Sequence, residues 1–333
     1  MSHFHEMFIT LILVVFILSF AGTFIIKGIA IRKNIIDIPN IRSSHLKPTP
    51  RGGGLAIAVT WFIVLLVLLI LKEISIQLAL ALLCGFPIAV IGLIDDLVSI
   101  PPKVRLIIQF IFISLAVFSL GGFSDIDLGF AVLYSPIIFS ISAVIGIVWL
   151  TNLFNFLDGI DGYLSVETIF ICLAAFFLMR VNLPLFLAAA TLGFLIWNWQ
   201  PAKIFMGDVG STLLGFTIGI FAIYYQNINQ ASIIIWLMLT SLFWFDATTT
   251  LIRRFRNHEN LSEAHKKHAY QRIVQSGFSH KKTVIYSLGI NFFILVLVWI
   301  ALKFPFLLLP MFCINIIILY IVMRLVDKRL SFH

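Results

Sequence analysis

The densest group of residues able to do chemistry is the stretch Asn152–Gly162, which reads N-L-F-N-F-L-D-G-I-D-G. Asn152, Asn155, Asp158 and Asp161 recur every three residues, which predicts one helical face or a helix end running into a turn. Glycine follows each carboxylate and lets the backbone bend closely around a ligand. Such polar groups beside a long apolar run are costly in a membrane, which favours a functional site. The alternative is a polar loop that caps a helix.

Two other acidic groups also lie at the ends of apolar segments. Asp95 and Asp96 are adjacent in I-G-L-I-D-D-L-V, and Asp208 lies in F-M-G-D-V-G-S-T. The alternative is that Asp95 and Asp96 only anchor the helix at the membrane interface. Acids at a helix C-terminus oppose the helix dipole, however, which argues against a purely structural role. Magnesium is held by one or two carboxylates together with substrate phosphates. The acids therefore predict a divalent-metal site shared with a phosphate.

Basic loops accompany the acids. Lys47 and Arg51 lie in K-P-T-P-R-G-G-G, whose glycines open a predicted helix with N–H groups suited to an anion such as phosphate. His265 and His268, in A-H-K-K-H-A-Y-Q-R, are spaced for one helical face among lysines, which favours phosphate recognition over a two-histidine metal site. The alternatives are a loop that only sets topology and a basic surface attracted to anionic lipid.

The remaining candidates lie around two other segments. Asn198 and Phe205 flank the P-A-K motif and supply amide and aromatic surface suited to a base or a sugar. Asp246 lies inside an apolar segment, one to two turns before Arg253 and Arg254. We expect Asp246 to be structural and to pair with one of these arginines.

The composition determines the elements that must position these residues. The 333-residue chain is 61% hydrophobic and 11% charged, with a mean hydropathy of +1.07, which is not the composition of a soluble globular protein. Many apolar stretches approach the roughly 20 residues that cross a bilayer as a helix, and strand-like alternation is missing. We therefore expect an all-α polytopic integral membrane protein, organised as a single domain over residues 1–333.

The distribution of positive charge predicts the topology. Of 23 Lys and Arg residues, 20 fall in one set of connections, which the positive-inside rule assigns to the cytoplasm. The N-terminus is then periplasmic, the C-terminus cytoplasmic, and the candidate site on the cytoplasmic face. The net charge of +8 is accordingly a topology and lipid signal, not one for nucleic acid. About 11 spans are expected, at roughly residues 7–27, 53–71, 78–94, 104–120, 136–153, 164–179, 183–199, 211–226, 231–252, 283–302 and 305–323.

This inventory of acids, cations and amides on one membrane face is typical of magnesium-assisted phosphoryl transfer, where catalysis is mainly positioning and charge neutralisation. The alternative from another class is a secondary transporter with acidic coupling residues, which places charges near the bilayer midplane and often shows inverted repeats. A CDP-alcohol phosphotransferase also uses D-G-rich motifs. The stretch D-G-I-D-G-Y lacks the downstream Ala-Arg and the second acidic half of that motif.

Over nearly its whole length the chain resembles the polyprenyl-phosphate N-acetylhexosamine-1-phosphate transferases, glycosyltransferase family 4. The resemblance is carried by the P-T-P-R-G-G-G loop, the D-D pair, N-x-x-N-x-x-D-G-x-D-G, P-A-K-I-F-M-G-D-V-G-S and the histidine-containing last loop. It implies transfer of a sugar 1-phosphate from a UDP-N-acetylhexosamine to undecaprenyl phosphate in a bacterial cytoplasmic (inner) membrane, with release of UMP. It also implies Mg2+, with Mn2+ as an alternative ion, and a homodimer.

The resemblance also implies roles for individual residues. Asp95 and Asp96 match acids that act on the lipid phosphate, and Asp208 together with Asp95 matches the metal ligands. Asp158 and Asp161 match the acids of the Asn-Asp motif, with Asn152 and Asn155 beside them. The remaining matches are to substrate-binding positions: Asn198 and Phe205 at the nucleotide, Lys47 near the phosphates, and His265 and His268 as the histidines of the last loop. The histidines depart from the family's usual clusters, because two lysines separate them. That form resembles the branch that starts O-antigen or other surface polysaccharides rather than the peptidoglycan enzyme, and it leaves the UDP-sugar open.

Overall fold

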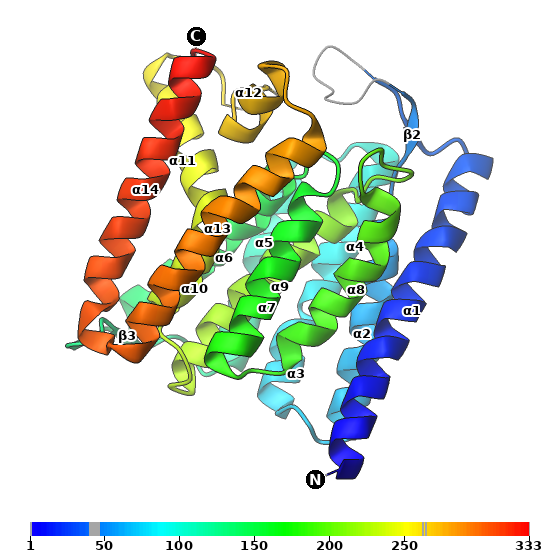
Figure 1. The fold of residues 1–333 in the computed structure, drawn as a ribbon. Coiled ribbons are helices and arrows are strands. Elements are labelled where there is room, and N and C mark those ends of the chain that lie inside the picture. Colours follow the sequence, from blue (N-terminus) through cyan, green and yellow to red (C-terminus); the bar gives the residue numbers. More distant parts are fainter. Residues whose placement is uncertain (1, 40–46, 262, 264, 333) are drawn as a thin grey trace.

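The computed structural model describes residues 2–39, 47–261, 263 and 265–332, and its regular structure is dominated by helices (Figure 1). The helices are α1 (Ser2–Arg32), α2 (Gly54–Ile70), α3 (Ile76–Leu83), α4 (Gly85–Val98), α5 (Pro102–Ser119), α6 (Pro136–Phe156), α7 (Tyr163–Met179), α8 (Leu183–Asn198), α9 (Asp208–Asn227), α10 (Ile233–Leu239), α11 (Ser241–Arg256), α12 (Ala269–Gln275), α13 (His280–Lys303), the 3-10 turn η1 (Pro305–Leu307) and α14 (Leu308–Arg329). Two short antiparallel pairs complete it, β1 (Ile36–Asp37) with β2 (Thr49–Pro50) and β3 (Asp125–Asp127) with β4 (Val132–Tyr134).

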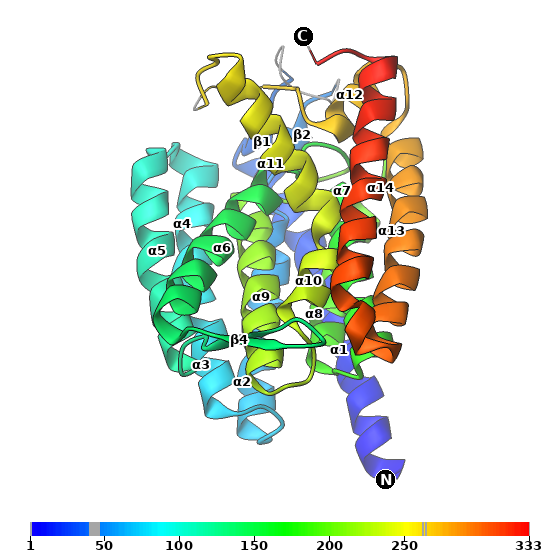
Figure 2. The same cartoon turned by 90° about the vertical axis from the view of Figure 1, so that its left-hand side faces the viewer.

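The helices form one bundle whose two ends differ. The C-terminus, α12 and the β1–β2 pair lie at one end, and the start of α1 and the β3–β4 pair lie at the other (Figures 1 and 2). Large apolar side chains such as Ile17, Phe118, Phe177 and Phe292 stay exposed on the outer faces of the bundle. Soluble proteins rarely expose apolar surface on this scale, whereas a lipid-facing helix does.

The structure supports an all-α polytopic membrane protein. Among the described residues, seven helices are long and apolar enough to cross a membrane, with α3 and α4 counted as one, and the bent pair α10–α11 is an eighth candidate. The helices α2, α7 and α8 are shorter but apolar. Each expected span falls on one of these segments, while the number of crossings and their orientation stay predictions.

One expected span is bent. The segment we predicted over residues 231–252 consists of α10 and α11, which meet at 75°. The junction contains no Pro or Gly; instead Thr240 Oγ1 donates to Trp236 O (2.8 Å) and Asn315 Nδ2 of α14 donates to Ser241 Oγ (2.9 Å). Hydroxyls that bond to the preceding turn bend helices. Hydropathy alone gives no sign of such a bend.

Helix α9 is the centre of the bundle and is buried along almost its whole length. It packs against α4 closely enough that a Cβ on Gly92 would lie 2.8 Å from the backbone of Asp208. It also packs against the start of α2, where a Cβ on Gly54 would lie 2.5 Å from Gly210 Cα. Glycine is needed at both positions because two backbones meet there. This packing brings the first residue of α9 against the end of α4.

Candidate active site

The acids predicted from sequence gather at the end of the bundle that also holds the C-terminus. Asp96, near the end of α4, is buried, and its Oδ1 and Oδ2 accept from the backbone N–H groups of Asp208 (3.0 Å) and Val209 (3.3 Å). The Asp96 carboxylate therefore caps the N-terminus of α9, where a negative charge is favourable. This explains how an acid at the unfavourable end of α4 is stabilised.

A single arginine joins the other two acids of this group. Arg105, in the first turn of α5, donates from Nη1 to Asp208 Oδ2 (2.7 Å) and also contacts Asp95 Oδ2. Asp95 Oδ1 accepts from the backbone N–H of Ile100 (2.5 Å). Sequence reasoning counted Arg105 only toward topology. The signal that could have identified it is its place just after the Pro101–Pro102 turn, which returns α5 toward the acids on α4.

The Asn-Asp motif contributes from α6 and from the turn that follows it. Asn152 Nδ2 donates to Gln109 Oε1 of α5 (2.7 Å), and Asn155 Nδ2 donates to Ser211 Oγ of α9 (3.0 Å). Asp158 lies in the turn after α6 and is partly buried. Burial, and then the nearby carboxylates of Asp208, Asp96 and Asp161, raise the pKa of the Asp158 carboxyl well above its usual range. The structure therefore brings this motif to the same acidic cluster.

Asp161 and Asn198 lie one layer behind and connect loops. Asp161 is buried, and its Oδ2 accepts from Ala202 N–H (3.0 Å), while its backbone N–H donates to His280 Nδ1 (3.2 Å). Asn198 is also buried, accepts from Gly162 N–H (2.9 Å) and donates to Ile204 O (3.0 Å). Both side chains tie the turn at 158–162 to the loop at 199–207. Their assignments as catalytic and nucleotide-contacting residues stay predictions.

The loop before α2 docks on the loop before α9. The N–H groups of Gly53 and Gly54 donate to Phe205 O (2.9 Å) and Met206 O (2.8 Å), and Phe205 N–H donates to Pro50 O (2.8 Å). The expectation that these glycine N–H groups are available to an anion is therefore wrong, because carbonyls already accept from them. Arg51 donates to the backbone O of Asp96. Lys47 is exposed, at the border of the described residues.

The last loop brings the two histidines together, though not on a helix. His268 is buried and caps α12, whereas His265 lies in irregular structure before it, with the ring centroids 4.8 Å apart. The expectation of one helical face is therefore wrong. Burial, and then the neighbouring His268 and Arg254, lower the pKa of His265 to about 4. The His265 imidazole is then neutral near pH 7 and acts as a hydrogen-bonding group, so cationic phosphate recognition falls to other side chains.

Asp246 is structural, as expected, but with other partners. Its Oδ1 and Oδ2 accept from Ala269 N–H (2.8 Å) and Tyr270 N–H (3.4 Å), which holds the N-terminus of α12. The expected pairing with Arg253 or Arg254 is wrong, because those arginines pair with Asp327 (2.8 Å) and Glu259 (3.1 Å). The periodicity of α11 alone could not reveal partners that lie so far along the chain.

Tyr270 is a second residue that sequence reasoning missed. Its buried hydroxyl donates to Phe156 O (3.2 Å), at the end of α6. Its ring stacks on Tyr163, with centroids 5.0 Å apart, and a Cβ on Gly159 would lie 2.1 Å from its hydroxyl. Tyr270 thus connects the histidine loop to the turn that carries Asp158.

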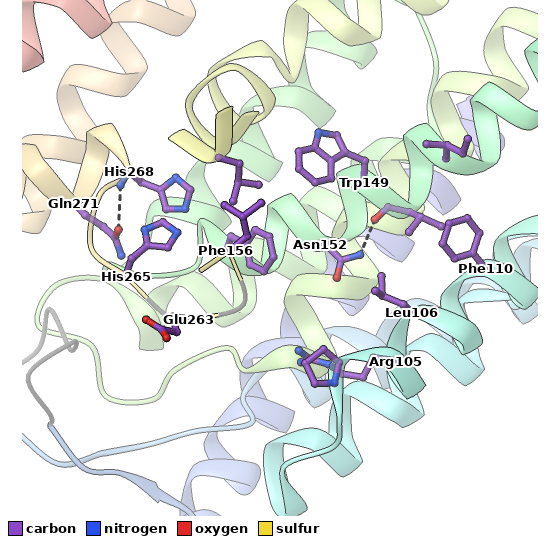
Figure 3. Close-up of a pocket in the computed structure, with 15 residues that line it drawn as sticks. Arg105, Leu106, Phe110, Trp149, Asn152, Phe156, Glu263, His265, His268 and Gln271 are labelled. Carbon is purple, nitrogen blue, oxygen red and sulfur yellow. Dashed lines mark hydrogen bonds between the residues drawn. The ribbon is translucent and has the colours of Figure 1, made fainter. Parts of the chain in front are cut away.

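Arg105, the partner of Asp95 and Asp208, lines a cavity of about 620 Å³. Figure 3 shows the side chains around this cavity. Its lining includes the polar side chains of Arg105, Asn152, Glu263, His265, His268 and Gln271 and the apolar side chains of Leu106, Phe110, Trp149 and Phe156. Trp149 also lines a second, apolar cavity of about 490 Å³ between α6, α9 and α10–α11. Trp149 Nε1 donates to Thr248 Oγ1 (3.2 Å), so this side chain separates the two spaces.

The donor set of the cluster suits a hard divalent cation shared with a substrate. Asp95 and Asp208 both direct an oxygen at the same nitrogen of Arg105. In the part of the chain that the structure describes, three or more His, Cys, Asp or Glu side chains do not converge on a closed metal cage. Two carboxylates without a cage fit Mg2+ or Mn2+, because these ions complete their coordination with water and substrate phosphate.

Comparisons with known proteins agree with this chemistry. The family model described as "Glycosyl transferase family 4" matches residues 78–226. A Bacillus subtilis protein named "Probable undecaprenyl-phosphate N-acetylglucosaminyl 1-phosphate transferase" is 34% identical, covering 93% of this chain and 90% of its own. A Yersinia pestis "Undecaprenyl-phosphate alpha-N-acetylglucosaminyl 1-phosphate transferase" is 27% identical (83% and 79%), and a Prochlorococcus marinus "Phospho-N-acetylmuramoyl-pentapeptide-transferase" is 31% identical (68% and 70%).

Proposed function

The chain belongs to the polyprenyl-phosphate N-acetylhexosamine-1-phosphate transferases of glycosyl transferase family 4, and from this premise we propose its reaction. It transfers N-acetylhexosamine 1-phosphate from a UDP-sugar to undecaprenyl phosphate and releases UMP. UDP-N-acetylglucosamine is the first donor to test, because the Bacillus and Yersinia relatives are named for that sugar. The product would start O-antigen or another surface polysaccharide in a bacterial inner membrane. We also propose that the protein is a homodimer.

The main support for this proposal is the lining of the large cavity. Arg105, which contacts the carboxylates of Asp95 and Asp208, lines a cavity together with Asn152 and many apolar side chains. Such a mixed lining suits a lipid phosphate, which has a charged head and a hydrocarbon chain. The second apolar cavity beyond Trp149 offers further room for isoprene units, beside the bend between α10 and α11. A secondary transporter does not explain acids that gather at one end of the bundle and contact an arginine in the wall of such a cavity.

The residues suggest how the reaction proceeds. An oxygen of the lipid phosphate attacks the β-phosphorus of the UDP-sugar, a new P–O bond forms, and the bond to UMP breaks. Arg105 lies at the cavity to orient the lipid phosphate, and Asn152 lies beside it. Because burial and neighbouring carboxylates raise its pKa, the carboxyl of Asp158 is the acid best suited to take a proton from the attacking phosphate. A Mg2+ ion on Asp95 and Asp208, when bound, would neutralise charge on the phosphates.

The test is UMP release by the purified protein. The assay contains undecaprenyl phosphate, Mg2+ and a panel of UDP-N-acetylhexosamines. Release that requires both the lipid and the metal supports the transferase and names its sugar. A folded protein that releases no UMP with any donor contradicts the proposal.

A further inference from the structure

One nitrogen atom of Arg105 lies between the two carboxylates assigned to the metal. Nη1 contacts Asp95 Oδ2 and lies 2.7 Å from Asp208 Oδ2, so both oxygens point at the same spot. The Arg105 side chain is 24% exposed, and it lines the large cavity together with Asn152. The guanidinium is thus both the counter-ion of the two acids and a wall of the cavity that suits a lipid phosphate.

Arg105 Nη1 and a divalent metal ion cannot contact Asp95 Oδ2 and Asp208 Oδ2 at the same time. A magnesium ion sits at about 2.1 Å from its carboxylate oxygens, within the space that Nη1 occupies between Asp95 and Asp208. A divalent ion bound jointly by both carboxylates therefore requires the guanidinium to withdraw. Because Arg105 starts α5 at the cavity rim, its side chain has open space to withdraw into. A guanidinium released there presents its planar fork, which matches a phosphate with two hydrogen bonds.

We propose that Arg105 is a displaceable counter-ion, which neutralises Asp95 and Asp208 until a divalent cation replaces it and then binds the lipid phosphate in the cavity. This inference rests on the proposed function, and it makes the cation and the lipid phosphate bind cooperatively. The cation frees Arg105 for the phosphate, and the phosphate holds Arg105 away from the cation site. By linkage, each ligand must tighten the other by the same factor.

The experiment measures Mn2+ binding to the purified full-length protein by electron paramagnetic resonance, with and without undecaprenyl phosphate. In the wild-type protein the lipid should tighten Mn2+ binding by about tenfold, the range of a charged hydrogen bond gained or lost. Arg105→Ala should bind Mn2+ about tenfold more tightly than wild type without lipid, and should lose the lipid effect. Arg105→Gln serves as a second variant if Arg105→Ala does not fold.

Lys103→Ala is the matched control. Lys103 is exposed in the same first turn of α5, and its removal changes the net charge by the same amount without touching the two carboxylates. It should leave Mn2+ affinity and the lipid effect unchanged. A second titration with UDP-N-acetylglucosamine in place of undecaprenyl phosphate distinguishes the phosphate of the lipid from that of the nucleotide sugar. If only the nucleotide sugar tightens Mn2+ binding, the assignment of Arg105 to the lipid phosphate is overturned.

The experiments distinguish failure of the counter-ion role of Arg105 from failure of the proposed transferase function. If wild-type protein releases UMP but Arg105→Ala binds Mn2+ no more tightly, the counter-ion role is wrong and the transferase stands. Mn2+ binding that survives Asp208→Asn unchanged also overturns the inference, because the cation then lies elsewhere. If no UMP is released by the wild-type protein, the proposed function fails and the lipid arm of the inference fails with it.

Discussion

At the scale of single residues, Asp208 is where the acidic cluster depends most on one side chain. It starts α9, contacts Arg105 and lies beside the carboxylates of Asp96 and Asp158. Asp208→Asn keeps the shape and removes the charge. We expect UMP release to fall by at least about a hundredfold, as when one preorganised electrostatic group is lost. The melting temperature of the variant is the control, and near-wild-type turnover would contradict the role of Asp208.

Tyr270 allows a test of the link between the histidine loop and the Asp158 turn. Tyr270→Phe keeps the stack on Tyr163 but removes the part-buried hydrogen bond to Phe156 O, at a cost of about 1 kcal/mol. We expect a lower melting temperature and a lower kcat with little change in KM for the lipid. Tyr286→Phe is the control, since Tyr286 is an exposed tyrosine. Equal effects of the two changes would mean that the hydroxyl of Tyr270 positions nothing.

His265 predicts a pH dependence of stability. Its pKa is about 4 in the folded protein against an ordinary 6.5, so the unfolded chain binds more protons between these values. The contribution of His265 to stability is therefore complete above about pH 6.5 and declines as the pH falls toward 4. His265→Gln should flatten the fall in melting temperature between pH 7 and pH 5. A variant with the same pH slope as wild type would show that His265 is not buried as neutral imidazole.

At the scale of elements, the site depends on how closely α4 approaches α9. A Cβ on Gly92 would lie 2.8 Å from the backbone of Asp208, so Gly92→Ala must push the start of α9 away from Asp96. Overpacking of this kind costs about 1–3 kcal/mol. We expect lower stability and lower UMP release. Gly289→Ala is the control in α13, where a Cβ has nothing within 4 Å, and it should be neutral or slightly stabilising. Equal behaviour of the two variants would contradict the close approach.

The elements also show what sequence reasoning could reach. Hydropathy located the segments of all helices except the short α12, and the motifs located the acids that cluster, because an apolar run and a charged end are local properties. The bend between α10 and α11 was missed, because it depends on hydroxyl bonds within the segment and on Asn315 of α14. The partners of Asp246 and the role of Arg105 were missed for the same reason, since each contact joins separate elements. The glycine N–H groups before α2 were misjudged because a second loop covers them.

At the scale of the whole molecule, the chemistry is concentrated at one end of the bundle. Arg105 joins the end of α4 to the start of α9, and α12 contacts both the end of α6 and the C-terminal residues after α14. Figures 1 and 2 show α12 and the C-terminus at the same end of the bundle. Of the 23 Lys and Arg residues, 20 fall in the set of sequence connections that the positive-inside rule assigns to the cytoplasm, and the same set carries Asp95, Asp158 and Asp208. If the positive-inside rule holds, the cluster faces the cytoplasm, where a nucleotide sugar is available.

Site-directed labelling tests this orientation. In a variant with Cys84, Cys172 and Cys313 replaced by Ala, single cysteines are introduced as Lys203→Cys, in the exposed loop beside the site, and Glu73→Cys, in the exposed loop at the other end. A membrane-impermeant maleimide should label Glu73→Cys in right-side-out vesicles and Lys203→Cys only in inside-out vesicles. Each variant is the control for the other, and UMP release confirms that both are folded. The reverse pattern would place the acidic cluster outside the cell, away from nucleotide sugars, and would contradict both the orientation and the proposed reaction.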